Sequence, residues 1–238
     1  SARKVFCPSH DTADRIKRYF TLDNVTVRPH ELTIPDELLT IPKRRSKSPD
    51  TQITVAIIGA IGKHKGSSVI QRCAREAFRQ GIKIHFSIIG YTDCDEMLKL
   101  LDNVSITGPY KEYQLNSLIT EIMPDIVWLP SRWPETFCYT LSTALSFGLP
   151  IVAYKTGAFH ERLSEKNIRS GAQLLPFDAK PLDIVKALDK MAYRTKRDYA
   201  PQPCIYNLEE DYYGKSESLM DHESISLSEQ KLVGCKEF

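Results

Sequence analysis

The sequence of 238 residues predicts an α/β domain built on a doubly wound parallel sheet with helices on both faces. Strand-like and helix-like segments alternate from residue 51 onward, which is typical of parallel sheets. The first of these strands, "ITVAIIGAIG" at residues 53–62, is almost continuously apolar, as strands covered on both faces are. Because crossovers between parallel strands are right-handed, we expect a Rossmann-like domain over residues 51–195.

The alternation predicts each element of this domain in turn. Strands are expected at residues 53–62, 82–90, 104–110, 125–131, 149–158 and 172–177. Helices are expected at residues 67–81, 95–101, 111–123, 159–163 and 181–195. A further helix is expected to open near Pro134 and Glu135 and to stop at Gly148, because proline is tolerated in a first turn and glycine often ends a helix.

Three segments lie outside the regular alternation. Residues 1–34 are interpreted as a hinge strand and helix that lead in from an N-terminal domain missing from this chain, because the strand at 4–9 has no earlier strand to pair with. Residues 35–50 contain three prolines and a basic cluster and are predicted to form an exposed linker. Residues 196–238 are predicted to form a partly irregular C-terminal tail.

Composition argues against several classes of function. The 32 basic and 30 acidic residues nearly balance, so there is no electrostatic case for nucleic acid or for a membrane surface. No apolar run approaches the roughly 20 residues that span a bilayer, and no signal peptide opens the chain. The six cysteines are scattered without a Cys-x-x-Cys pair, which favours free thiols over a zinc site. We therefore expect a cytoplasmic protein with no metal, no cofactor and no transmembrane segment.

The loop at residues 59–68 is the most informative, because ligands of open parallel sheets bind beyond the carboxyl ends of the strands. It combines three glycines, two lysines and a serine that opens a helix: Gly59, Gly62, Gly66, Lys63, Lys65 and Ser67. Such a loop can approach a ligand closely and offer cations and free helix-terminal amides, which favours a phosphate site. It is neither a Walker A loop nor Gly-x-Gly-x-x-Gly. The alternative is a tight turn with exposed lysines.

A single carboxylate, Glu135, stands where the strand at 125–131 leads into the next helix. It either compensates the helix dipole or accepts hydrogen bonds from ligand hydroxyls. Helical spacing places Ser142 and Thr143 near the same side, so one helix face is expected to present all three residues to the cleft. Further along, Glu161 and Arg162 are interpreted as surface charges.

Together these segments resemble the C-terminal, donor-binding domain of group 1 (family 4) glycosyltransferases, which have the GT-B fold. The likeness covers residues 4–195 and is carried by "VFCPSHDTADRIKRYF", "IIGAIGKHKGSS" and "LPSRWPETFCYTLSTALSFGLPIVAYKTGA". It implies transfer of a hexose from a nucleotide-diphosphate sugar to an acceptor, with retention and without a bound metal. Polysaccharide or glycoconjugate biosynthesis is the implied setting.

The resemblance also implies roles for individual residues. Lys65 and Glu135 would be catalytic: Lys65 at the diphosphate and Glu135 at hydroxyls of the transferred sugar. Tyr110 would contact the base and Thr143 would face the ribose. The donor-binding set is Gly59, Gly62, Lys63, Gly66, Ser67, Tyr110, Phe137, Cys138, Tyr139 and Thr143. The implied partners are a nucleotide sugar and the missing acceptor-binding domain. Peripheral attachment to the inner face of the membrane, through that domain, stays open. This fragment alone is expected to bind nucleotide but to transfer nothing.

Two positions depart from the pattern of the family. Ala60 stands where the family usually has an arginine for the phosphate, and Thr143 replaces the second glutamate of Glu-x7-Glu. A neutral threonine makes weaker hydrogen bonds than a carboxylate. A non-catalytic nucleotide- or sugar-binding module therefore stays open as an alternative. A third alternative is a dinucleotide-dependent oxidoreductase domain, which would need Gly-x-Gly-x-x-Gly and an acid that ends the second strand. The motif is absent and the strand ends without an acid, although Asp93 is close.

Overall fold

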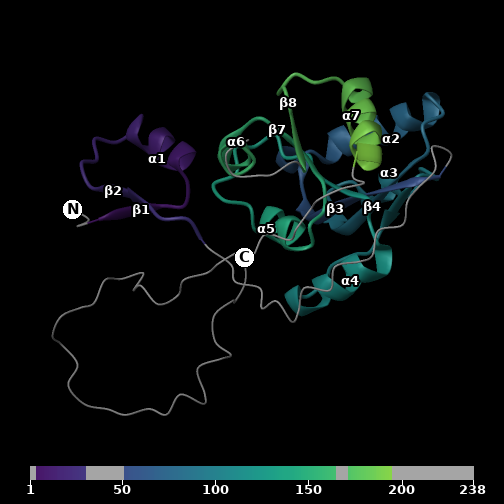
Figure 1. Cartoon of the computed structure of the whole chain (residues 1–238), viewed down its shortest axis with the longest axis horizontal. Coiled ribbons are helices and arrows are strands. Elements are labelled where there is room, and N and C mark those ends of the chain that lie inside the picture. Colours follow the sequence, from purple (N-terminus) through teal and green to yellow (C-terminus); the bar gives the residue numbers. More distant parts are fainter. Residues whose placement is uncertain (1–3, 31–50, 165–170, 195–238) are drawn as a thin grey trace, which may run out of the picture. The chain divides into compact units, whose positions relative to one another are not determined.

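The computed structural model describes residues 4–30, 51–164 and 171–194. The expected linker at 35–50 and the expected tail at 196–238 lie outside the described residues. Most of the described chain forms a parallel sheet with helices packed on both sides (Figure 1). The predicted α/β class is confirmed.

The main sheet has six strands in the order β5-β4-β3-β6-β7-β8, and every neighbouring pair is parallel. The strands are β3 (Ile53–Ile61), β4 (Ile84–Thr92), β5 (Val104–Ile106), β6 (Ile126–Leu129), β7 (Ile151–Tyr154) and β8 (Ala172–Leu175). The chain runs outward from β3 to β5 and then returns to the other side of β3 with β6. This reversal of strand order between β3 and β6 is the topological switch point at which open α/β sheets bind ligands.

The helices cover the two faces of the sheet in separate groups. They are α2 (Ser67–Arg79), α3 (Asp95–Leu98), α4 (Leu115–Ile122), α5 (Tyr139–Ser146), α6 (Gly157–Arg162) and α7 (Pro181–Arg194). One core cluster joins the sheet to α2, α3 and α7, and the other joins it to α4, α5 and α6. Figure 1 shows α2 and α7 above the strands and α4 below them. Along β3 alternate side chains enter opposite clusters, Val55 and Ile57 in one and Ala56 and Ile58 in the other, which explains the unbroken apolar run.

The N-terminal segment forms a separate two-stranded sheet. Strands β1 (Val5–Cys7) and β2 (Val25–Val27) pair in parallel in a separate sheet, and α1 (His10–Lys17) connects them. The hydroxyl of Ser9 accepts a hydrogen bond from the amide of Thr12 at 3.2 Å and so caps α1. The strand and the helix that the sequence predicts in this segment are both observed.

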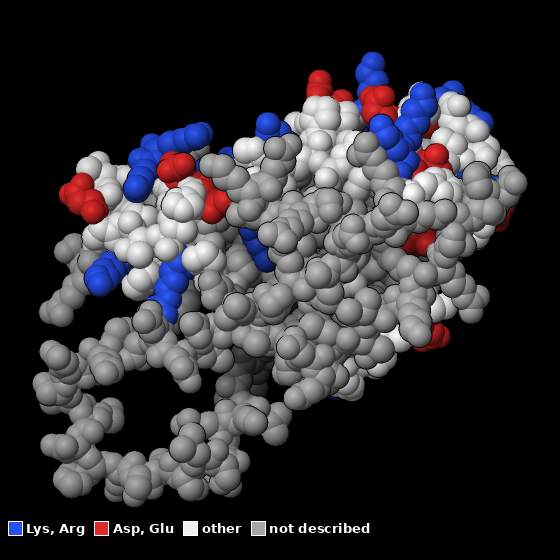
Figure 2. Space-filling model, viewed as in Figure 1, with Lys and Arg blue, Asp and Glu red and all other residues white. Residues whose placement is uncertain are grey.

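The surface carries charges of both signs. On the face shown in Figure 2, Lys and Arg side chains are interspersed with Asp and Glu over the described residues. No single-sign patch dominates that view of the described chain, in keeping with the near balance of charges in the sequence. Among the described residues, no helix has both the length and the apolar character needed to cross a bilayer.

The core beneath α2 and α7 contains a buried hydroxyl without a partner. Tyr154 is fully buried, and its hydroxyl has no hydrogen-bond partner among the described residues. Burial raises the pKa of Tyr154 from 10.0 to about 12. The unfolded chain therefore loses this proton first, and the hydroxyl lowers stability as the pH rises from 10 to about 12.

Replacing Tyr154 with phenylalanine should raise the free energy of unfolding by about 1 kcal/mol at neutral pH, because the unpaired hydroxyl is removed while the ring stays. It should also flatten the loss of stability above pH 10. Urea unfolding between pH 7 and 11 measures both effects. Tyr91→Phe, which removes a hydroxyl from a side chain that is 45% exposed, is the matched control. A less stable Tyr154→Phe protein would show that the hydroxyl has a partner, such as a buried water.

Candidate functional site

A pocket of about 420 Å³ opens at the carboxyl ends of β3 and β6, at the switch point of the sheet. The strands supply its floor, and the segment between β6 and α5 supplies most of its wall. Sixteen residues line it: His30, Ile58, Gly59, Ala60, Ile61, Lys65, Leu129, Pro130, Ser131, Glu135, Thr136, Phe137, Cys138, Tyr139, Thr140 and Phe159. The site therefore lies where the strand topology predicts it.

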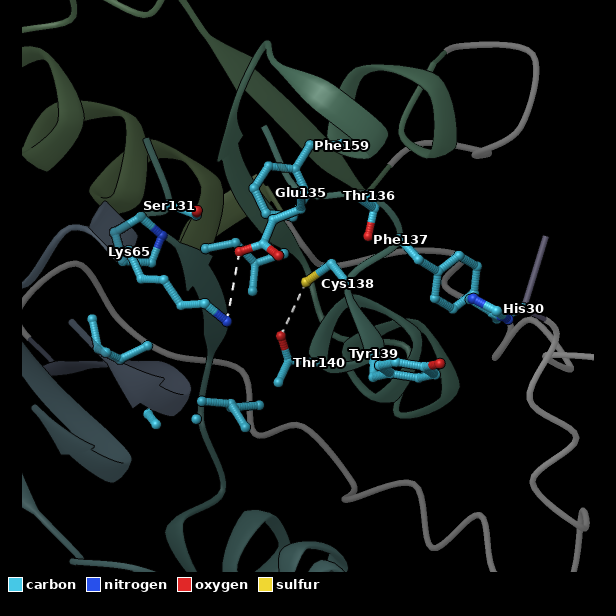
Figure 3. Close-up of a pocket in the computed structure, with 16 residues that line it drawn as sticks. His30, Lys65, Ser131, Glu135, Thr136, Phe137, Cys138, Tyr139, Thr140 and Phe159 are labelled. Carbon is cyan, nitrogen blue, oxygen red and sulfur yellow. Dashed lines mark hydrogen bonds and ion pairs between the residues drawn. The ribbon is translucent and has the colours of Figure 1, made fainter. Parts of the chain in front are cut away.

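Lys65 and Glu135 face each other across this pocket. The Lys65 Nζ lies 3.7 Å from the Glu135 Oε1, shown as a dashed line in Figure 3. The Lys65 side chain is 41% exposed and that of Glu135 is 17% exposed, so the carboxylate is the better shielded partner. The cation and the acid therefore line one and the same pocket. A pair this exposed contributes little to stability, about 0–1 kcal/mol.

The glycine-rich loop brings Lys65 to the pocket by packing on the loop that follows β6. Lys65 ends a short 3₁₀ turn (Lys63–Lys65), and Gly66 follows with a φ of +96°. A Cβ on Gly66 would lie 2.4 Å from the carbonyl oxygen of Pro130, so only glycine permits this approach. The amide of Arg132 also donates to the carbonyl of His64 at 3.2 Å. The two loops are thereby held against each other.

Glu135 is held from the opposite side by the start of α6. Its carbonyl oxygen accepts a hydrogen bond from the amide of Ala158 at 2.8 Å. Gly157 has a φ of +54°, and a Cβ there would lie 2.7 Å from the Glu135 nitrogen and 2.8 Å from its carbonyl oxygen. The backbone at Glu135 is thus fixed by a glycine turn 22 positions further along the chain.

The helix after the pocket begins later than expected. Helix α5 starts at Tyr139, so Glu135 lies in the preceding loop and not on the helix. The Glu135 carbonyl accepts a hydrogen bond from the Ala158 amide, and the Phe137 carbonyl accepts one from the Arg162 side chain. The Cys138 carbonyl, at the N-cap of α5, also accepts a hydrogen bond from Arg162.

The expectation that Glu135, Ser142 and Thr143 share one helix face is therefore wrong. Ser142 is buried and accepts a hydrogen bond from Arg162 at 2.8 Å. The Thr143 hydroxyl donates to the Tyr139 carbonyl at 3.4 Å, and Thr143 is not among the residues that line the pocket.

Three amides of the glycine-rich loop are hydrogen-bonded within the loop, contrary to the expectation of free amides there. The amides of Lys65 and Ser67 donate to the Gly62 carbonyl at 2.9 and 3.3 Å, and the Gly66 amide donates to the Lys63 carbonyl at 3.2 Å. These three amides therefore bind carbonyl groups of the same loop. Four residues of this loop line the pocket, namely Gly59, Ala60, Ile61 and Lys65, and the side chain of Lys65 is the charged one among them.

The other predicted residues divide into two groups. Gly59, Lys65, Glu135, Phe137, Cys138 and Tyr139 line the pocket, whereas Gly62, Lys63, Gly66, Ser67, Tyr110 and Thr143 do not. Tyr110 is half-buried and packs against the core cluster beneath α4, α5 and α6, and burial raises its pKa. The part that each of these residues plays toward a ligand stays a prediction.

Two residues without a predicted structural role bind parts of the chain that are far away in sequence. Arg162 donates hydrogen bonds to the carbonyls of Phe137 and Cys138. Glu161 accepts hydrogen bonds from the amides of His10 and Asp11 at 3.1 and 3.2 Å, which connects α6 to the start of α1. Their interpretation as surface charges is wrong, and no local pattern distinguishes them from surface charges.

An aromatic group borders the pocket near the start of α5. His30 stacks on Tyr139 with ring centroids 6.0 Å apart and meets Phe137 edge-on at 5.5 Å. Figure 3 shows these three side chains together, on the side of the pocket opposite Lys65. His30 was not predicted, since it lies in the N-terminal segment and is brought to the pocket only by folding.

Cys138 is the most unusual residue of the wall. Its φ of +69° is rare for a residue other than glycine, and it directly precedes α5. Burial raises the pKa of its thiol, and the Sγ lies 3.1 Å from the Thr140 hydroxyl. The thiol therefore stays protonated and contributes a weak polar surface rather than a nucleophile. Within the described ranges, no three His, Cys, Asp or Glu side chains gather as a metal site would require.

Fold and site together define a class of protein. A doubly wound parallel sheet with a pocket, a cation and a carboxylate at its switch point is the arrangement of α/β domains of the Rossmann type. The sequence model of the family described as "Glycosyl transferases group 1" matches residues 41–192, which is more than half of the chain. The chain belongs to this family of glycosyltransferases.

Several solved structures have a fold similar to that of this chain. The chain superimposes on TarM with a TM-score of 0.62 at 15% identity, covering 80% of this chain and 36% of TarM. For sucrose-phosphate synthase from Thermosynechococcus elongatus the TM-score is 0.61 at 15% identity, with coverage of 82% and 53%. For HepE from Anabaena in complex with UDP and glucose it is 0.56 at 17% identity, with coverage of 81% and 58%.

Identities this low show the fold alone, which resembles the domains of GT-B glycosyltransferases. The chain spans between 36% and 58% of the length of these three structures. None of the curated proteins compared with this chain matches it significantly.

Proposed function

We propose that this chain is the C-terminal, donor-binding part of a retaining, family 4 hexosyltransferase that uses a nucleotide-diphosphate sugar. The observation that carries the proposal is the Lys65–Glu135 pair, with 3.7 Å between Nζ and Oε1, in the pocket at the switch point. Membership of the group 1 glycosyltransferases makes a sugar donor the natural ligand. HepE, a structural neighbour, is seen in complex with UDP and glucose, which supports the choice of donor class.

The two charged groups suit opposite ends of such a donor. The ammonium of Lys65 neutralises charge on the diphosphate, which grows as the bond to the sugar breaks. The carboxylate of Glu135 accepts hydrogen bonds from sugar hydroxyls. In the free protein Lys65 and Glu135 form an ion pair with each other. The donor replaces this pair with one contact between Lys65 and the diphosphate and another between Glu135 and the sugar.

The start of α5 offers the second source of positive charge. Helix α5 begins at Tyr139 beside the pocket, and the amides of a first helical turn have no helical carbonyl to bind. They suit a phosphate oxygen, and the helix dipole favours an anion there. This contribution offsets the presence of Ala60 where an arginine is usual in the family.

The reaction exchanges one bond of the sugar for another. The bond from the anomeric carbon to the diphosphate oxygen breaks, and a bond from that carbon to an acceptor hydroxyl oxygen forms on the same face. The acceptor proton passes to the departing diphosphate, and no metal is required for this balance. The acceptor-binding domain lies outside this chain in the proposal, so the chain alone binds the donor without transfer. The proposed setting is polysaccharide or glycoconjugate synthesis in the cytoplasm. Any peripheral attachment to the membrane would be made through the acceptor-binding domain.

Titration calorimetry of the purified chain with UDP, GDP and dTDP tests the proposal. We expect one of the three to bind with a dissociation constant in the micromolar to low millimolar range, about −4 to −8 kcal/mol. The matched control is the corresponding nucleoside, which lacks the charges that Lys65 would contact. Failure of all three diphosphates to bind would overturn the proposal.

A second candidate is a non-catalytic module that binds a nucleotide or a sugar. Two observations favour it: Ala60 lines the pocket without a charge, and Thr143 lies outside the lining. The two candidates differ in turnover. A transferase slowly hydrolyses its bound nucleotide sugar when the whole protein is incubated without acceptor, whereas a module leaves the donor intact.

A further inference from the structure

Arg162, at the end of α6, makes an unusually complete set of contacts with the wall of the pocket. Its Nη1 donates to the carbonyls of Phe137 and Cys138 at 2.8 and 2.9 Å, and its Nη2 donates to the Ser142 hydroxyl at 2.8 Å. Its guanidinium carbon lies 4.1 Å from the centroid of the Phe137 ring. Charge-assisted hydrogen bonds of this kind are the strong ones in proteins. One side chain thus holds both the turn before α5 and the first turn of the helix.

The turn that Arg162 holds would not keep its shape by itself. Cys138 has a φ of +69° and a ψ of +93°, a region that side chains other than glycine rarely adopt. Cys138 itself makes no side-chain hydrogen bond that caps α5. Such a conformation persists only where surrounding contacts determine it, and the two carbonyl hydrogen bonds from Arg162 are contacts of that kind.

The geometry of the peptide unit carries this constraint to the pocket. In a planar trans peptide the carbonyl and the following N–H point in opposite directions. Because the Phe137 and Cys138 carbonyls turn toward Arg162, the N–H groups of Cys138 and Tyr139 point away from it. Both of these residues line the pocket, whereas Arg162 does not.

We propose that Arg162 is a positioning residue that aims the backbone amides of Cys138 and Tyr139 at a phosphate group of the bound donor. This inference rests on the proposed function, and it assigns the phosphate contact to these two amides and their orientation to Arg162. A guanidinium is required because its planar fork reaches two carbonyls and a hydroxyl at once, which a single ammonium does not do in a fixed geometry.

The test compares Arg162→Met and Arg162→Lys with the wild-type chain. In calorimetry, Arg162→Met should weaken the binding of UDP by about tenfold or more, because the amides lose their alignment. The affinity for uridine, which has no phosphate, should stay the same. Arg162→Lys should recover part of the affinity for UDP. Arg79→Met removes an arginine that is 71% exposed and paired with Glu76 on α2, and it should bind both ligands as the wild type does.

A measurement without ligand accompanies the titrations. Hydrogen exchange of the Cys138 and Tyr139 amides should speed up about tenfold or more in Arg162→Met, while exchange across β3 and β4 stays unchanged. Equal UDP affinity in Arg162→Met and wild type would overturn the inference, and so would an equal loss for UDP and uridine. If wild-type protein binds none of UDP, GDP or dTDP, the proposed function fails. Unchanged exchange in the variant would then separately refute the role of Arg162.

Discussion

Replacing Lys65 with methionine should weaken the binding of UDP, or of whichever nucleoside diphosphate binds best, by about 10- to 150-fold. This range corresponds to losing one charge-assisted contact of about 1.5–3 kcal/mol. The free energy of unfolding should change by less than about 1 kcal/mol, because the pair with Glu135 is partly exposed. Calorimetry gives the affinity and urea unfolding gives the stability.

Glu135→Gln is the matched comparison for Lys65→Met, because it removes the other charge of the same pair without changing its shape. It should leave the affinity for UDP unchanged or raise it up to about fivefold, since Lys65 is released from its partner. Transfer or donor hydrolysis by the whole protein should fall about 100- to 1,000-fold if the carboxylate acts at the sugar in the transition state. Equal losses of UDP affinity in the two variants would contradict the assignment of Lys65 to the phosphates and Glu135 to the sugar.

Replacing Gly157 with alanine should lower the free energy of unfolding by about 2–4 kcal/mol. Alanine at a φ of +54° costs about 1 kcal/mol in backbone strain. A Cβ at 2.7–2.8 Å from the backbone of Glu135 adds a steric clash of about 1–3 kcal/mol. The clash can be relieved only by moving Glu135, so the affinity for the nucleotide sugar should fall with the stability. Urea unfolding and donor titration measure the two effects.

Gly81 provides a control for Gly157 that isolates the steric clash. Gly81 has a similar φ of +64°, and a Cβ there would have no atom within 4 Å. Gly81→Ala should therefore cost only the backbone part, about 1 kcal/mol, and should leave donor binding unchanged. Equal destabilisation by the two substitutions would mean that the close approach of a Cβ at residue 157 to Glu135 does not lower the free energy of unfolding.

Much of the sheet follows from patterns that are local in sequence. The apolar run of β3 indicates a strand buried on both sides, and the alternation with helices indicates parallel pairing. The expected third to sixth strands extend beyond the observed β5, β6, β7 and β8, and the fifth runs into the start of α6. Apolar or turn-rich residues next to a strand do not show where its pairing stops. The meeting of Lys65 and Glu135 was also predictable, since both follow strands whose carboxyl ends lie on one edge of the sheet.

The start of α5 and the partners of its preceding loop were not predictable in this way. Helical periodicity near Pro134 favours an earlier start of the helix. Such a pattern reflects only interactions between residues that are close in sequence. The observed loop instead gives its carbonyls to Ala158 and to Arg162, which lies 25 residues from Phe137. Competition between local and distant hydrogen-bond partners is settled by tertiary packing.

The sequence by itself thus determined the α/β architecture, the family and the edge of the sheet where a charged pair forms, because periodicity and strand order depend on short stretches of chain. Only the tertiary structure decided which backbone groups are free to meet a ligand. It paired three amides of the glycine-rich loop with carbonyls of the same loop, turned Ser142 toward Arg162 and brought His30 to the pocket. The physical reason is that each backbone donor or acceptor binds the partner that the whole fold brings nearest, and that partner is often far away in sequence.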